Sequence, residues 1–310
     1  MSEFLVIGES VADIVRRPGE PEVTYPGGSP ANVAYGLARL GRATALLTEL
    51  GQDPGGRLIA GHLAGGGVEV LAAGGPGQRT SSAVVTLDGA GKPAYQLDVH
   101  WTLDAAQLPP RLGELRPSHV HVGSVAALLA PGGERARALA ERLAGGASVS
   151  YDPNVRPALL GEPAAAVSAV ERWVALAGVV KASDEDVAWL YPGRSLGEVA
   201  GRWLESGVGL VLLTRGAEGA EGHTRGGARA EVPAAPAEVA DTVGAGDAFM
   251  AATLDALATR GLLGPLARPA LAALTEADLT AVLGHAARAA ALTVSRPGAN
   301  PPNRAELPAG

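Results

Sequence analysis

The residues whose types and spacing could carry out chemistry lie in the run DTVGAGDAFM, at positions 241–250. Glycines at the start of a helix let successive backbone amides converge on one point, where the helix dipole adds positive potential. The amides around Gly244, Ala245 and Gly246 therefore predict an anion site, which phosphoryl transfer requires. Asp247, on the first predicted helical turn, is placed to take a proton from an attacking hydroxyl.

A simpler interpretation of this run is that Asp247 caps the helix and the glycines form a tight turn. Taken alone, the segment does not decide between the two, because a short Gly-x-Gly is a weak signal. The chain contains no Walker A lysine motif, no Rossmann G-x-G-x-x-G and no protein-kinase HRD or DFG set. The best-known nucleotide-binding classes are therefore excluded.

A second candidate group is the run GGSPANVA, at positions 27–34. Gly27 and Gly28 permit close approach of the backbone to a ligand, and Asn32 offers two donors and one acceptor for a hydroxyl. Asp13 lies upstream, where the first predicted strand ends. The alternative is an ordinary Ser-Pro helix start, in which Asn32 caps the helix or faces solvent.

Short apolar runs alternate with longer helical patterns along the chain. This alternation predicts an α/β fold with a mostly parallel sheet covered by helices on both faces, and ligands at the carboxyl ends of the strands. The predicted strands are 4–8, 44–48, 119–123, 147–151, 178–182 and 209–214. The predicted helices are 30–41, 54–66, 132–145, 163–177, 196–207, 247–260 and 277–292.

Two segments, 11–26 and 82–103, break this rhythm with alternating polar and apolar residues. They predict half-exposed antiparallel strands that form a small lid, the second pair turning at Asp88–Gly91. No internal repeat or linker interrupts the chain, so we expect one domain over 1–310 that carries this lid. Because proteins usually cover exposed strand edges, we also expect a homodimer joined through the lid strands.

Composition excludes several classes of partner. The 310 residues include 25 basic and 32 acidic side chains, a net charge of -7 with no basic run. Neither a nucleic acid nor a membrane surface is therefore expected as a partner, and a small molecule is. The chain has no cysteine, and its 6 histidines form no zinc-binding pair. No segment reads as a signal peptide or a membrane span, so we expect a cytoplasmic protein.

The two glycine-rich runs together resemble the two signatures of the PfkB, or ribokinase-like, carbohydrate kinase family. Residues 27–41 (GGSPANVAYGLARLG) are similar to the N-terminal signature, and residues 241–251 (DTVGAGDAFMA) to the C-terminal one. Further landmarks follow in the family's order over nearly the whole chain: SYDPNVR at 150–156, VKAS at 180–183, LTRGAEG at 213–219 and TVSRPGA at 293–299.

The resemblance implies a ribokinase-like three-layer α/β/α fold and an ATP-dependent kinase for a sugar hydroxyl. It makes Asp247 the base and the amides of Gly244–Gly246 the anion hole for the γ-phosphoryl group. It matches Asp13, Gly28 and Asn32 to positions that hold sugar hydroxyls.

The same resemblance assigns the nucleotide-binding loop to Thr214, Gly216 and Gly219. Lys181, one of only two lysines, is implied as a phosphate contact, although a solvated lysine is the ordinary alternative. Asn154 and Arg156 resemble a turn that reaches the substrate or phosphates in some relatives.

The family has an Asn-x-x-Glu motif that is linked to magnesium and phosphate. This chain has Ser183-Asp184-Glu185-Asp186 in its place. Asp186 keeps the final acid as a possible Mg²⁺ ligand, and Ser183 stays with the nucleotide, as in bacterial fructokinases. Magnesium is expected mainly with ATP, since Mg²⁺ keeps several waters. Asp241 and the carbonyl of Val243 are candidates for a monovalent cation, K⁺, although Val243 replaces a frequent Thr.

The acceptor sugar is expected to be fructose. The run IGESVAD at positions 7–13 resembles bacterial fructokinases, and so does YQLDVHW at 95–101, where Trp101 could cover the sugar or simply pack. Ribose, 2-keto-3-deoxygluconate, tagatose-type sugars and nucleosides remain open as acceptors.

Two other classes of protein are rivals to this interpretation. A non-catalytic sugar or nucleotide sensor would be expected to have lost residues of the GAGD run, which is intact here. An oxidoreductase would need a Rossmann motif, which the chain lacks.

Overall fold

The computed structural model describes residues 3–17, 19–75, 77–87 and 93–308. Within them the main sheet has the strand order β13-β12-β11-β10-β9-β8-β1-β4-β5. Neighbouring strands from β11 to β5 pair in parallel, and β12 and β13 add antiparallel pairs at one edge. The strands are β1 (Phe4–Ile7), β4 (Thr44–Glu49), β5 (Glu69–Ala73), β8 (His119–Gly123), β9 (Ser148–Asp152), β10 (Val179–Ser183), β11 (Leu210–Thr214), β12 (Ala220–Thr224) and β13 (Arg229–Val232).

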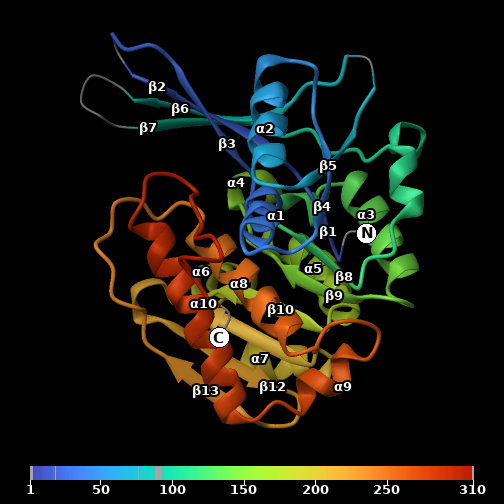
Figure 1. Ribbon diagram of the computed structural model, residues 1–310, viewed down its shortest axis with the longest axis vertical. Coiled ribbons are helices and arrows are strands. Elements are labelled where there is room, and N and C mark those ends of the chain that lie inside the picture. The colour runs from blue at the N-terminus through green and yellow to red at the C-terminus, as the bar shows by residue number, and fades with distance from the viewer. Residues whose placement is uncertain (1–2, 18, 76, 88–92, 309–310) are drawn as a thin grey trace.

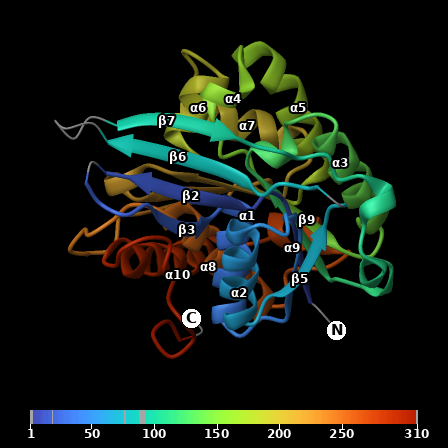
Figure 2. The same cartoon turned by 90° about the horizontal axis from the view of Figure 1, so that it is seen from above.

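Helices cover both faces of this sheet, and each face has its own apolar core. Successive strand residues point to opposite faces, so Phe4 and Val6 join one core while Leu5 and Ile7 join the other. The first core takes α1 (Ser29–Arg39), α2 (Pro54–Gly65), α8 (Ala245–Thr259), α9 (Ala267–Ala272) and α10 (Glu276–Val294). The second takes α3 (Gly132–Leu143), α4 (Pro157–Leu160), α5 (Pro163–Leu176), α6 (Asp184–Leu190) and α7 (Leu196–Glu205). Figure 2 shows the two helical layers on either side of the sheet, as a three-layer α/β/α fold requires.

The predicted elements all form, with ends that shift by one or two residues. The strands β5, β12 and β13 and the short helices α4, α6 and α9 were not predicted. The strand β12 (AEGHT), which lies between β11 and β13, carries too few apolar residues for a period to be visible. The seven-residue α6 is fixed instead by a capping box between Ser183 and Asp186.

The segments at 11–26 and 82–103 build a separate small sheet, which extends away from the main body in Figure 1. Its order is β3-β2-β6-β7, from β2 (Val11–Arg16), β3 (Val23–Gly27), β6 (Ser81–Leu87) and β7 (Pro93–Asp98). The β2–β3 and β6–β7 pairs are antiparallel as predicted, but β2 and β6 pair in parallel. The prediction of an all-antiparallel lid was therefore wrong. The reason is that β2 and β6 follow the parallel strands β1 and β5 and leave the main sheet in the same direction. The predicted turn at 88–91 lies outside the described residues.

In the part of the chain that the structure describes, none of the helices could span a lipid bilayer.

Candidate active site

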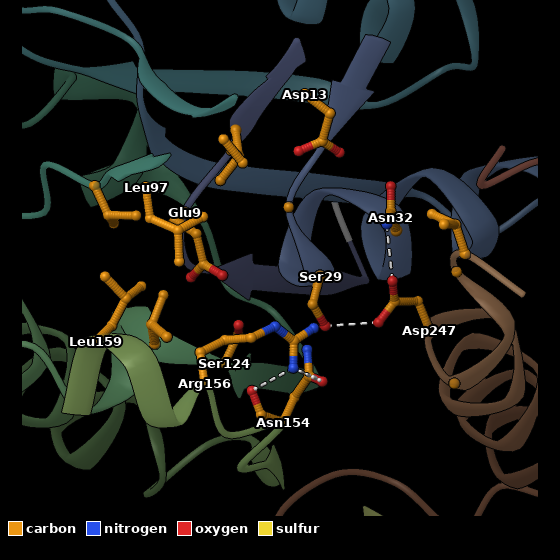
Figure 3. A pocket seen from close by; sticks show the side chains of 18 of the residues that line it. Glu9, Asp13, Ser29, Asn32, Leu97, Ser124, Asn154, Arg156, Leu159 and Asp247 are labelled. Atoms are coloured by element: carbon orange, nitrogen blue, oxygen red, sulfur yellow. Dashed lines mark hydrogen bonds between the residues drawn. The ribbon is translucent and has the colours of Figure 1, made fainter. Parts of the chain in front are cut away.

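A cavity of about 370 Å³ lies between the carboxyl ends of the parallel strands, the small sheet and the start of α8. The side chains on its walls converge from segments far apart in the sequence (Figure 3). Of the predicted site residues, the cavity is lined by Asp13, Gly28, Asn32, Arg156, Lys181, Val243, Gly244, Ala245, Gly246 and Asp247. Asn154, from the same turn as Arg156, lines it too. Glu9, Ser29 and Ser124 also line it, and they were not predicted as site residues.

Asp247 lies at the start of α8 with its carboxylate held from α1. Ser29 Oγ donates to Asp247 Oδ1 at 2.6 Å, and Asn32 Nδ2 donates to Asp247 Oδ2 at 2.8 Å. The two donors are three residues apart and so share one face of α1. This face of α1 packs closely against α8. If Gly36 carried a Cβ, that atom would lie 2.9 Å from the Cβ of Ala251 on α8.

The capping interpretation of Asp247 is not what the structure shows. The N-cap of α8 is Gly244, whose φ of 77° is in the left-handed region that favours glycine. A Cβ on Gly244 would also lie 2.7 Å from the Ala299 Cβ, so a larger residue has no room. Gly244 therefore forms the turn, while the Asp247 carboxylate faces the cavity.

Lys181 lies beside Gly246, which is in the segment predicted to form the anion site. Its Nζ is 3.0 Å from Asp152 Oδ2 and 3.1 Å from where a Cβ on Gly246 would stand, and its side chain is only 5% exposed. Burial disfavours the ammonium, but the nearby carboxylates, Asp152 first, outweigh burial and raise the pKa of Lys181. Lys181 is thus a buried cation beside Gly246, and the solvated alternative is wrong.

The opposite end of the cavity is built around Asp13 on β2. A Cβ on Gly27 would lie 2.0 Å from Asp13 Oδ2, and one on Gly28, where φ is 100°, would lie 2.7 Å from the Glu9 carbonyl oxygen. Gly27 does not line the cavity, but its missing side chain lets the Asp13 carboxylate lie against the chain. Both glycines are therefore needed to form this wall.

The floor of the cavity consists of polar residues that follow three neighbouring strands. Glu9 follows β1, Ser124 follows β8, and Arg156 follows β9 and donates from Nη1 to Asn154 Oδ1 at 2.9 Å. Burial raises the pKa of Glu9 to about 7 and that of Asp13 to about 6, and Arg156 opposes both shifts. The only sequence signal for Glu9 and Ser124 is that each is polar and directly follows a glycine at a strand end.

Apart from Lys181, the residues predicted for the nucleotide form a second group outside the cavity walls. Ser183 and Thr214 are register partners at the ends of the adjacent strands β10 and β11. Gly216 and Gly219 follow with φ values of 50° and 98°, and a Cβ on Gly219 would lie 2.1 Å from the Val232 carbonyl oxygen. The structure thus places these four residues together after the carboxyl ends of β10 and β11. Lys181 is also on β10.

The candidate metal ligands are already engaged. Asp186 Oδ1 accepts from the Val155 amide, and Asp186 Oδ2 accepts from the amide and hydroxyl of Ser183. Asp241 accepts from the amides of Val243 and Gly298. In the described residues, no group of three or more His, Cys, Asp or Glu side chains could hold a metal ion.

Trp101 does not reach the cavity. It is 3% exposed in the second core, where a Cβ on Gly132 would lie 2.3 Å from its Cδ1 atom. Of the two roles considered for this side chain, packing is the one that the structure shows.

The sequence matches a family of known enzymes over almost its full length. The model of pfkB family carbohydrate kinases matches residues 1–306. A fructokinase from Klebsiella pneumoniae is 34% identical over 272 residues, which cover 84% of this chain and 86% of that protein. A fructokinase from Rhizobium leguminosarum bv. trifolii is 33% identical over 268 residues, which cover 84% of this chain and 81% of that protein.

Solved structures agree with this match. A fructokinase from Vibrio cholerae O395, in a form with fructose, ADP and calcium ion bound, superposes with a TM-score of 0.81 at 29% identity. The match covers 99% of this chain and 98% of that one. A fructokinase from Xylella fastidiosa with bound ATP also gives a TM-score of 0.81, at 28% identity over 96% of this chain and 94% of that one.

Proposed function

The chain belongs to the pfkB family of carbohydrate kinases, and we propose that it phosphorylates fructose with ATP, using Asp247 as the base. One observation carries the proposal. The Asp247 carboxylate lies in a single cavity between the amides at the start of α8 and a polar wall containing Asp13 and Arg156. The choice of fructose is supported by two relatives named fructokinase, which are 33% and 34% identical to this chain.

The reaction follows from this order of groups. The acceptor hydroxyl gives its proton to Asp247, and its oxygen attacks the γ-phosphorus while the bond to the β–γ bridging oxygen breaks and ADP leaves. Ser29 and Asn32 fix the orientation of the carboxylate through their two hydrogen bonds. The amides of Gly244–Gly246 and the Lys181 ammonium stabilise the negative charge on the transferred group.

The charges of the cavity favour a neutral sugar. Glu9 and Asp13 place two carboxyl groups at the sugar end, with Arg156 as the cation that opposes their pKa shifts. An acid sugar such as 2-keto-3-deoxygluconate would add a third carboxylate to this end, and like charges at short range destabilise one another. Fructose brings only hydroxyls, which can donate to carboxylates and accept from the guanidinium.

For the nucleotide, we propose that ATP binds along Ser183, Thr214, Gly216 and Gly219. Mg²⁺ would enter with the ATP phosphates, because Asp186 is 4% exposed and its carboxylate already accepts three hydrogen bonds, whereas Asp241 accepts one at each oxygen. Asp241 and the Val243 carbonyl are the proposed ligands of K⁺. A fructokinase double mutant from Vibrio cholerae O395 was solved with fructose, ADP and potassium ion bound, which supports a potassium ion in this chain by similarity.

We further propose that residues 1–310 form one cytoplasmic kinase domain, with the small sheet as its lid. The lid strands leave edges that a second copy can cover, so a homodimer through 11–26 and 82–103 is expected. Light scattering at micromolar concentration tests the dimer, and a monomer would contradict it.

The test of the function is ADP release with Mg-ATP and a panel of acceptors: fructose, ribose, tagatose, glucose, 2-keto-3-deoxygluconate and adenosine. We expect the highest kcat/KM with fructose and the lowest among the sugars with the acid sugar. Faster turnover of another acceptor would overturn the choice of fructose. If no acceptor in the panel gives ADP release although ATP still binds, the result would favour a sensor.

A further inference from the structure

Glu9 is a buried carboxyl that the proposed reaction does not use. It lies 3% exposed just after β1 and lines the cavity, where Figure 3 shows its carboxylate pointing toward Arg156. Glu9 Oε2 accepts from the Ala126 amide at 3.0 Å, and the side chain also hydrogen-bonds to the Ser124 side chain. Among the described residues, Glu9 makes no ion pair within salt-bridge distance. Burying a carboxyl without a paired cation is unfavourable, so its presence here calls for a functional explanation.

The backbone beside Glu9 is held in a strained conformation. Ser124 has φ 61° and ψ −161°, a region that residues other than glycine rarely adopt. Its amide donates to the Asp152 carbonyl at 2.8 Å, which ties it to the next strand. Asn154, on the same cavity floor, has φ 35°. Strained residues of this kind persist where surrounding groups over-determine them, and they cluster at ligand sites.

The floor therefore presents a carboxyl, a hydroxyl and a guanidinium from three adjacent strand ends, away from the anion site. A sugar hydroxyl matches this set, because it can donate to Glu9 and accept from Arg156 at the same time. Asp13 is the other carboxyl at this end, so two hydroxyls of one sugar can each find a separate acceptor.

We propose that Glu9 binds a hydroxyl of the sugar other than the one phosphorylated, and that this contact selects which sugar is accepted. This inference rests on the proposed function, since it assumes a sugar in the cavity. A site built to hydrogen-bond a substrate hydroxyl rejects the analogue that lacks it, because the buried polar group is left unpaired.

The experiment compares the wild type with Glu9→Gln on fructose and on a set of fructose analogues that each lack one hydroxyl. The rates are measured at pH 8, above the Glu9 pKa of about 7, where the carboxylate is ionised. Charge-assisted hydrogen bonds are roughly twice as strong as neutral ones. We therefore expect Glu9→Gln to lower kcat/KM for fructose about 10-fold. On one analogue alone, the loss should fall below about 3-fold, because the hydroxyl that Glu9 binds is already missing.

Glu49→Gln is the matched control. Glu49 is also a buried glutamate at a strand end, 4% exposed, and its carboxylate accepts from the amide and hydroxyl of Thr102 and from the Leu103 amide. It does not line the cavity. We expect this variant to lower stability without changing the ratios among the analogues.

The outcomes separate the inference from the function. If the wild type phosphorylates fructose but Glu9→Gln shows equal losses on every analogue, Glu9 is structural and the inference is overturned. If the wild type accepts no sugar, the proposed function has failed first. Glu9→Asp keeps the carboxyl and serves as the second variant, with the same selective pattern expected. Failure of both variants to fold, judged by thermal melting, would also assign Glu9 a structural role and overturn the inference.

Discussion

Asn32 and Asp247 are 215 positions apart in the chain and are joined by a hydrogen bond of 2.8 Å from Nδ2 to Oδ2. Asn32 lies on α1 and Asp247 on α8, and the two helices pack closely at Gly36 and Ala251. The N-terminal signature thus does more than line one end of the cavity. It also orients the carboxylate of the C-terminal signature.

The second donor to that carboxylate gives a direct prediction. Ser29→Ala removes the 2.6 Å bond to Asp247 Oδ1 and leaves the Asn32 bond in place. A hydrogen bond to a charged group contributes about 1.5–3 kcal/mol, so we expect kcat to fall about 10-fold or more, with little change in KM for ATP. Ser10→Ala is the control, because Ser10 is buried outside the cavity and accepts from Thr48 Oγ1 at 2.9 Å. Equal kcat values for Ser29→Ala and the control would show that Ser29 does not orient the base.

The Lys181–Asp152 pair predicts that stability and activity can be separated. Lys181→Met leaves the Asp152 carboxylate buried without its partner, which typically costs about 3–5 kcal/mol of unfolding free energy. Adding Asp152→Asn removes the orphaned charge and should recover most of that stability. Activity should stay low in both variants, because neither has a cation at the anion site. Urea unfolding and kcat/KM for ATP are the measurements, and recovery of activity in the double variant would contradict the phosphate role of Lys181.

The pKa of Glu9 predicts a pH-dependent difference in stability. The ordinary value is 4.5 and the folded value is about 7, raised by burial against smaller opposing effects of Ser124, the Ala126 amide and Arg156. The folded state then binds more protons than the unfolded state between these values. The stability that this group contributes is complete below pH 4.5 and is lost as pH rises through 7.

Glu9→Gln lacks this titration. Its unfolding free energy relative to the wild type should therefore rise from pH 5 to pH 8, by up to about 3 kcal/mol at 1.36 kcal/mol per pKa unit. Urea unfolding at pH 5, 6.5 and 8 measures the difference. If the difference in unfolding free energy between the variant and the wild type does not change with pH, the pKa of Glu9 is not raised in the folded protein.

The sequence predicted the elements that have strong apolar periods or glycine-rich starts, and it missed what depends on strand order. The turn at the start of α8 could be predicted because Gly244–Gly246 and Asp247 are contiguous. Glu9 and Ser124 could not, because they become neighbours only once β1 and β8 lie side by side in the sheet. The burial of Lys181 against Asp152 has the same cause, since β9 and β10 pair in parallel.

The proposal that Asp247 is the base is tested most directly by single-turnover phosphorylation of fructose with Asp247→Asn. The matched control is Asp278→Asn, since Asp278 occupies the same third position of α10 and there completes a capping box with Thr275. We expect the Asp247 variant to lose at least about a hundredfold in rate while ATP and fructose still bind, because a positioned base contributes about 10²–10⁴-fold. The control should keep its rate and lose some stability. A rate for Asp247→Asn equal to that of the control would contradict the assignment of Asp247 as the base.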